Sequence, residues 1–234
     1  MVALRQALFR ALLAVLCGVA IAGTAMAQRI GEARMTADNL MVALREWQGA
    51  NKPDETLKPI GKMTVKFDGE DRIVEFAWYS FLGDMQIRFV FDSPALLVNA
   101  TAEEFARLHL TPEEAVELAM ANIKRVYGEP RTEAWVGGLT LVLGKSPDLD
   151  SSYFLDRAFW RTLLAQHPEG LVAAVPKRGG LVFAPVTDTA TVEGMRRGVG
   201  YLYRSSEKMR ISSALYLFKD DRWTVFQAPV GAAQ

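Results

Sequence analysis

Hydrophobic and polar residues alternate along 62–67 in the way that half-buried β-strands do, and two further strand candidates follow at 73–81 and 85–91. An Asp-Gly pair at 68–69 separates the first two segments, and a Gly-Asp pair at 83–84 separates the last two. Asp-Gly between alternating segments is a strong signal for a tight hairpin turn. The pattern therefore predicts an antiparallel meander with one buried face.

Apolar residues with a spacing of three to four predict helices elsewhere in the chain. The first prediction covers 37–49, with Thr36 as N-cap. Threonine followed three residues later by glutamate occurs at 101–104 and at 111–114, and both match a capping box. The second box should open a helix that runs to about Tyr127.

The last part of the chain mixes helices with pairs of strands. Asp150 is the expected N-cap of a helix at 151–166. The other expected elements are a strand at 139–143, hairpins at 171–184 and 212–227, and a helix at 191–207. Strand pairs and helices in this order indicate an α+β fold with mostly antiparallel sheet, packed with four to five helices.

The first 27 residues have the pattern of a secretory signal peptide. Arg5 and Arg10 precede an uncharged apolar run at 11–22, and the cleavage pattern Ala-Met-Ala ends at Ala27. The run is shorter than the roughly 20 residues of a transmembrane helix, so we expect no stable membrane span after cleavage. The sequence thus predicts a periplasmic or secreted protein that begins at Gln28.

We divide the mature chain into three regions. Residues 28–95 would form an N-terminal helix plus meander, 96–228 a second α+β region, and 229–234 a tail. Cys17, the single cysteine, lies in the predicted signal, so a hydrophobic core without disulfides should stabilise the fold.

The charge balance argues against nucleic acid as a partner. Two of the 27 basic residues and none of the 27 acidic ones lie in the predicted signal, so the mature net charge is about −2. A near-neutral, mixed surface has no basic footprint for nucleic acid or an anionic membrane. We expect a protein, peptide or small-molecule partner instead.

Metal and cofactor chemistry has little support in the sequence. The two histidines, His109 and His167, lie far apart, and His167 falls where a helix end is expected. Without a thiol or an HExxH motif, a zinc site lacks its usual ligands, which leaves carboxylate binding of Mg²⁺ or Ca²⁺ as the exception. The sequence therefore predicts no cofactor.

Four polar residues form the candidate site: Asn122, Asp148, Asp150 and Ser151. Aspartates two positions apart can act as nucleophile and acid, although an aspartate directly before an apolar-periodic segment commonly caps a helix. No Gly-x-Ser-x-Gly elbow is present in the chain. Aromatic residues on the predicted strands could either fill a core or line a groove; they are Trp78, Tyr79, Phe81, Phe89 and Phe91.

Residues 110–226 resemble the YtpQ-like family of uncharacterised bacterial proteins. The resemblance rests on the segments 111–114 leading to Asn122, then 150–155, 172–176, 181–184 and 211–226. It implies no reaction, so no catalytic residue is carried over from the family. The predicted signal departs from the cytoplasmic location expected of its members.

Two functions follow from these observations. The first is a non-enzymatic periplasmic binding or accessory domain, and the alternative is a metal-independent hydrolase that uses Asp148 and Asp150. An enzyme should bring at least two of the four candidate residues to one concave site, whereas a binding domain should expose an apolar or aromatic surface.

Overall fold

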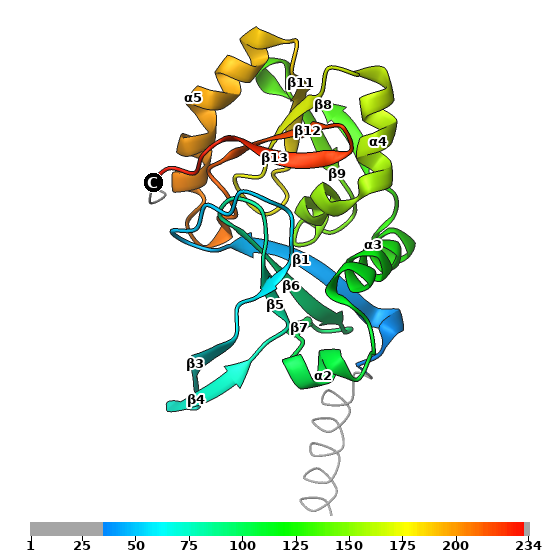
Figure 1. Ribbon diagram of the computed structural model, residues 1–234, viewed down its shortest axis with the longest axis vertical. Helices are drawn as coiled ribbons and strands as arrows, with labels where there is room; N and C mark the ends of the chain where they lie inside the picture. Colours follow the sequence, from blue (N-terminus) through cyan, green and yellow to red (C-terminus); the bar gives the residue numbers. More distant parts are fainter. Residues whose placement is uncertain (1–34, 232–234) are drawn as a thin grey trace, which may run out of the picture.

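The computed structural model describes residues 35–231 and confirms the predicted α+β class (Figure 1). The predicted signal peptide at 1–27 lies outside these residues. The first sheet and its projecting hairpin occupy one end of the molecule in Figure 1, and the second sheet occupies the other. Between residues 35 and 231, no helix has the length and apolar character needed to cross a bilayer.

The first sheet is antiparallel and is centred on β6 (Met85–Asp92). Its strand order is β1 (Leu40–Glu46), β6, β5 (Trp78–Ser80) and β2 (Lys58–Pro59), with β7 (Leu97–Asn99) also paired to β6. Helix α2 (Ala102–Ala106) follows β7 in the chain. Helix α3 (Pro112–Tyr127) packs against β1.

The second sheet is also antiparallel. Its strand order is β13 (Arg222–Gln227), β12 (Leu215–Lys219), β10 (Leu171–Ala174), β11 (Val182–Pro185), β9 (Thr140–Leu143) and β8 (Arg131–Ala134). The predicted hairpins at 171–184 and 212–227 are confirmed, because β10 pairs with β11 and β12 with β13.

Helices cover both faces of the second sheet. Val172 and Ala174 share a core with Val192 on helix α5 (Thr189–Ser205). The intervening Ala173 instead faces the main core, which contains Trp160 of helix α4 (Arg157–Gln166). Because side chains alternate along a strand, α5 and α4 lie on opposite faces of this sheet, as Figure 1 shows.

The main core is continuous between the two sheets. It includes Phe89 of the first sheet, Tyr216 of the second, and Phe154 between them in the chain. The regions 28–95 and 96–228 therefore share one core, and β7 of the second region completes the sheet of the first.

The two predicted capping boxes are confirmed. The hydroxyl of Thr111 accepts the backbone N–H of Glu114 at 3.2 Å, and the Glu114 carboxylate accepts the Thr111 N–H at 2.8 Å. Thr101 and Glu104 make the same pair of contacts before α2. Helix α5 also forms where expected, but it begins two residues earlier, after the N-cap Asp188.

The predicted helix at 37–49 is wrong. A short 3-10 helix, η1, covers Ala37–Asn39, and the next seven residues form strand β1. Leu40 to Leu44 are all buried, so both faces of this strand are covered and polar residues do not alternate along it. The spacing of the apolar residues therefore resembled that of a helix.

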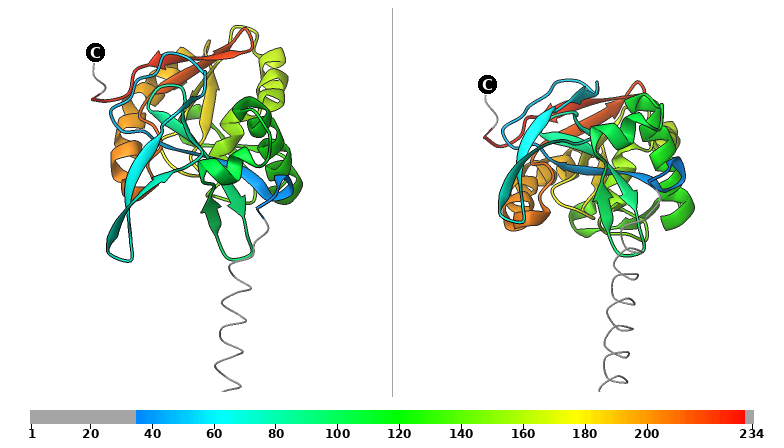
Figure 2. Two further views of the ribbon diagram at one scale, coloured as in Figure 1. Left: turned by 60° about the horizontal axis from the view of Figure 1, so that its bottom comes forward. Right: turned by 90° about the horizontal axis from the view of Figure 1, so that it is seen from below.

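The predicted meander is only partly correct. The turn at 68–69 is confirmed, with φ of 51° at Asp68 and 84° at Gly69, but its strands β3 (Lys62–Phe67) and β4 (Glu70–Glu75) form a separate two-stranded hairpin. The hairpin projects from the body of the molecule in Figure 1 and in the left view of Figure 2. The prediction of one buried face also fails, since Met85, Gln86 and Ile87 are consecutive and all buried.

The predicted helix at 151–166 is divided. Residues Asp150–Leu155 form the 3-10 helix η3, and α4 begins only at Arg157. The N-cap of α4 is Asp156, whose carboxylate accepts the N–H of Phe159 at 3.2 Å. The capping role that the sequence predicted for Asp150 is therefore wrong.

Candidate functional site

A groove lies between α3 and the segment formed by η3 and α4, and it holds a hollow of about 260 Å³. Its apolar lining comes from both sheets, from the residues that flank β2 and β5, from α3 and from η3: Leu57, Phe81, Ile87, Val116, Phe154, Leu155 and Trp223. Its charged lining consists of Glu55, Glu113, Glu117, Arg157 and Arg161. A second hollow of about 260 Å³ shares Val116, Glu117 and Arg157 with the first and extends along α3 to Lys124.

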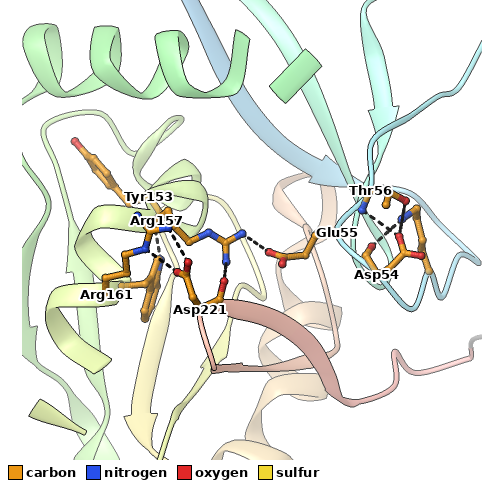
Figure 3. A network of polar contacts seen from close by, with 9 residues as sticks. Asp54, Glu55, Thr56, Tyr153, Arg157, Arg161 and Asp221 are labelled. Carbon is orange, nitrogen blue, oxygen red and sulfur yellow. Dashed lines mark hydrogen bonds and ion pairs between the residues drawn. The ribbon is translucent and has the colours of Figure 1, made fainter. Parts of the chain in front are cut away.

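Arg157 joins three segments that are distant in the sequence (Figure 3). Its Nη2 donates to Glu55 Oε1 at 2.7 Å, and its Nη1 donates to the carbonyl oxygen of Asp221 at 3.0 Å. Glu55 belongs to the loop before β2, and Asp221 belongs to the turn between β12 and β13. The first residue of α4 thereby fixes both of these segments at the groove.

Arg161 lies one turn further along α4 and makes a bidentate ion pair with the Asp221 carboxylate (Figure 3). The distances are 2.8 Å from Nε to Oδ1 and 2.6 Å from Nη2 to Oδ2. Hydrogen bonding to Arg161 lowers the pKa of Asp221 below its ordinary value. The guanidinium groups of Arg157 and Arg161 therefore already donate hydrogen bonds to acceptors within the protein.

Asp221 makes this contact from a strained backbone. Its φ is 59°, and the preceding Asp220 has a φ of 51°. Left-handed conformations of non-glycine residues cost on the order of 1 kcal/mol or more, and they occur mainly where the surrounding structure enforces them. The turn thus combines two unfavourable conformations with the carboxylate that holds Arg161.

Glu113 and Glu117 lie one turn apart on α3 and both line the groove. Neither forms an ion pair within residues 35–231, in contrast to Glu55. Glu113 is also in the first turn of α3, where the helix dipole stabilises a negative charge. The groove therefore has an apolar lining, two matched arginines, and two carboxylates that are open to a cation.

Asn122, a candidate from the sequence, has a structural position on α3. Its Nδ2 donates to the carbonyl oxygens of Ala37 and Leu40 at 2.8 and 2.9 Å. Its Oδ1 accepts from Arg125 at 3.0 Å. The side chain is thus fully engaged in holding η1 and β1 against the helix.

Asp150 is buried beside its own loop. Its Oδ1 accepts the backbone N–H of Ser146 at 3.2 Å, and burial raises its pKa above the ordinary value. Ser151 donates to the carbonyl oxygen of Lys177 at 3.1 Å.

Asp148 lies nearer the surface and pairs with Arg178 at 3.4 Å. The three candidates Asp148, Asp150 and Ser151 are therefore close in the chain, but their side chains contact different partners. Neither they nor Asn122 line the two hollows of the groove.

The histidines lie at turns. His167 is the C-cap of α4, as predicted, and its N–H donates to the Leu163 carbonyl at 3.1 Å. His109 lies between α2 and α3 with a φ of 55°. Across the described part of the chain, no three His, Cys, Asp or Glu side chains group closely enough to hold a metal ion.

A buried cluster around Asp84 escaped the sequence analysis. Asp84 is 4% exposed, and its carboxylate accepts from the Tyr216 hydroxyl at 3.1 Å, from the Ser213 N–H at 3.2 Å and from the Ser212 hydroxyl. Burial raises the pKa of Asp84, and burial together with Asp84 raises the pKa of Tyr216. Ser212 is fully buried, so this serine is closed to a substrate.

Sequence alone could not reveal this cluster, because its members lie far apart in the chain. The only local sign of the cluster that we find in the sequence is Gly83, which precedes Asp84 and packs against Tyr216. A Cβ atom there would lie 2.5 Å from the Tyr216 hydroxyl, and the φ of Gly83 is 63°.

Comparison with protein-family models, with curated proteins and with solved structures returned no match for this chain.

Proposed function

We propose that the protein is a binding domain whose groove beside α3 takes a short peptide segment, with an apolar side chain next to a basic one. The proposal rests on a difference between the charged residues of the groove: the arginines already have carboxylate partners within the protein, whereas two glutamates do not. Arg157 and Arg161 have acceptors from Glu55 and Asp221, while Glu113 and Glu117 have no cationic partner among residues 35–231. The charge left for a ligand is therefore negative, and it borders an apolar lining.

The size and form of the groove favour a peptide over a compact molecule. Each hollow of about 260 Å³ is smaller than the typical 300–1,000 Å³ of a site for a drug-sized ligand. The two hollows adjoin along α3, so each can hold about one large side chain of an extended segment. Burial of apolar area at about 25 cal/mol per Å² supplies affinity, and the carboxylates supply charge selectivity.

The test is calorimetric titration of the purified protein with two acetylated, amidated peptides, Leu-Lys-Phe-Lys and Leu-Glu-Phe-Glu. We expect the basic peptide to bind, with an affinity that falls as salt is added, since exposed charges are screened. Replacing Glu113 and Glu117 with glutamine should weaken it about three- to tenfold, because each exposed pair contributes roughly 0.2–1 kcal/mol.

The matched control removes two carboxylates outside the groove. Glu103 lies on α2 and Glu193 on α5, and both are exposed and paired with arginines. The double change to glutamine at these positions should leave the affinity within about twofold, since the contacted charges remain. Equal binding of both peptides, or equal loss in both double variants, would contradict the proposal.

The hydrolase alternative has less support. Asp150 is held by the backbone of Ser146, and Asp148 pairs with Arg178, away from the groove. The double variant Asp148→Asn, Asp150→Asn should therefore bind the basic peptide as the unchanged protein does.

We also propose that the protein is exported and cleaved after Ala27. The support is the charged, apolar and small-residue pattern of residues 1–27. Intact-mass measurement of periplasmic material should give a chain that begins at Gln28, whereas a full-length species in the membrane fraction would refute the cleavage. The resemblance of residues 110–226 to the YtpQ-like family stays a prediction.

A further inference from the structure

Three arginines gather on the face of the first sheet opposite the groove. In the antiparallel register Arg45 of β1 lies opposite Gln86 of β6, and Arg88 follows two residues later, so all three side chains share one face. Ile87, which lines the groove, points to the other face. Arg178 belongs to the loop between β10 and β11, and its backbone N–H donates to the carbonyl oxygen of Met209 at 2.9 Å.

The guanidinium groups lie close enough to repel one another. Burial, followed by the charges of Arg178 and Arg88, lowers the pKa of Arg45 to about 10. Burial and the charge of Arg178 likewise lower the pKa of Arg88 to about 10. Arginine normally titrates above 12, so these surroundings disfavour the cationic form. The charge of Arg178 thus adds to burial in disfavouring the cationic forms of Arg45 and Arg88.

Acceptors for these cations are scarce. The Nε atoms of Arg88 and Arg178 are buried without a hydrogen-bond partner in the region 35–231. The Arg88 guanidinium instead lies 3.7 Å from the centre of the Trp78 ring. Asp148 pairs with Arg178 at 3.4 Å, but over the described residues no carboxylate lies within 4.0 Å of Arg45 or Arg88.

The charge balance indicates what is missing. Three guanidinium groups and the Asp148 carboxylate leave a net charge of about +2 at neutral pH. Buried charge without a counter-charge is costly, and a dianion would balance it. Guanidinium groups present paired N–H donors that match the oxygen atoms of phosphate. The exposure of 28% for the Arg178 side chain leaves one side of the cluster open to solvent.

We propose that Arg45, Arg88 and Arg178 form a binding site for a phosphate dianion, either free or as a monoester. The Arg88 guanidinium lies over the Trp78 ring and would donate to the oxygen atoms of the anion. Arg178 closes the site from the second sheet, so an occupied site links the two sheets. This site shares no residue with the groove and is independent of its ligand.

The test is to follow thermal unfolding and tryptophan fluorescence of the protein while inorganic phosphate or O-phosphoserine is added at constant ionic strength. We expect a saturable rise in Tm with phosphate and a weaker response to acetate. Arg45→Gln and Arg88→Gln should each lower the affinity for phosphate about tenfold or more, because each removes charge-assisted hydrogen bonds. Arg178→Gln, at a more exposed position, serves if either inner variant fails to fold.

Arg197→Gln is the matched control, since Arg197 is exposed on α5 and pairs with Glu193. It should retain the full response. A tighter response to O-phosphoserine than to phosphate would identify the ligand as a monoester, and the reverse would identify free phosphate. If phosphate acts no more strongly than chloride, or shifts Tm equally in all variants, the proposed site does not exist.

Discussion

The Asp84 cluster and the arginine cluster both bury ionisable side chains where segments of the two sheets meet, but the hydrogen bonds of these side chains are satisfied to opposite degrees. The Asp84 carboxylate receives three hydrogen bonds from Ser212, Ser213 and Tyr216. Arg45, by contrast, donates only to the neighbouring Leu44 carbonyl within the described chain. A carboxyl group whose hydrogen bonds are saturated holds the fold together, whereas a cation with too few acceptors opposes folding and is available to a ligand.

The groove contains both kinds of charge. Arg157 and Arg161 are saturated by Glu55 and Asp221 and fix the shape of the groove. Glu113 and Glu117 form no ion pair in the described part of the chain, and we propose that a ligand supplies their cationic partner.

The largest expected effect comes from breaking the saturated cluster. Asp84→Ala should lower the free energy of unfolding by about 3 kcal/mol or more, because it leaves three buried donors without an acceptor. Urea unfolding measures this loss. Asp71→Ala, at an exposed position on β4, is the control and should change stability by no more than about 0.5 kcal/mol. A loss of under about 1 kcal/mol at Asp84 would show that the cluster is not structural.

The pH dependence of stability sharpens the same point. Because burial raises the folded-state pKa of Asp84 above its unfolded value, its stabilising contribution is full below the unfolded pKa and is lost as pH rises through the folded pKa. The stability of the unchanged protein relative to Asp84→Asn should therefore fall as the pH is raised from about 4, the unfolded value of an aspartate. Urea unfolding over this range tests it, and a relative stability that rises with pH would have the wrong sign.

The arginine cluster should respond in the opposite direction. Arg45→Met keeps a long side chain and removes a buried cation, so without phosphate it should raise the free energy of unfolding by about 1 kcal/mol. Arg197→Met, on the surface of α5, should stay within about 0.5 kcal/mol of the unchanged protein. Destabilisation by Arg45→Met in phosphate-free buffer would mean that Arg45 is a structural residue.

Substitutions in the two tight hairpin turns should have smaller effects on stability. The turn at 68–69 has the favoured Asp-Gly pair, whereas the turn at 220–221 has aspartate at both left-handed positions. Asp220→Gly should stabilise the protein by about 0.5 kcal/mol, because glycine adopts this conformation without strain. Asp221→Gly should gain less, because it also loses the contact with Arg161. Equal gains in thermal unfolding would show that this contact contributes nothing.

Much of the fold follows from local signals in the sequence. Both capping boxes, the Asp-Gly turn and the two C-terminal hairpins form where the chemistry of a few adjacent residues requires them. The failures have a common cause. Strand β1 is buried on both faces, and its apolar run of Leu40–Leu44 lacks the alternation by which a half-buried strand is recognised.

The sites were harder to predict, because their members come from separate segments. Glu55 and Arg157 lie 102 residues apart in the chain, and Arg45 and Arg178 belong to segments of different sheets. The aspartates at 148 and 150 drew attention because they are close in sequence, yet their side chains contact different partners. Proximity in the chain predicted the two capping boxes and the Asp-Gly turn correctly, but it failed for the cap at Asp150 and gave no access to groups that converge from distant segments.

The central claim is that two open carboxylates on α3 select a basic ligand, and reversal of their charge tests it most directly. Glu113→Lys with Glu117→Lys should be titrated calorimetrically with the basic peptide Leu-Lys-Phe-Lys and the acidic peptide Leu-Glu-Phe-Glu. The account predicts that the unchanged protein prefers the basic peptide and that the double variant prefers the acidic one. An unchanged preference in the folded double variant would contradict it.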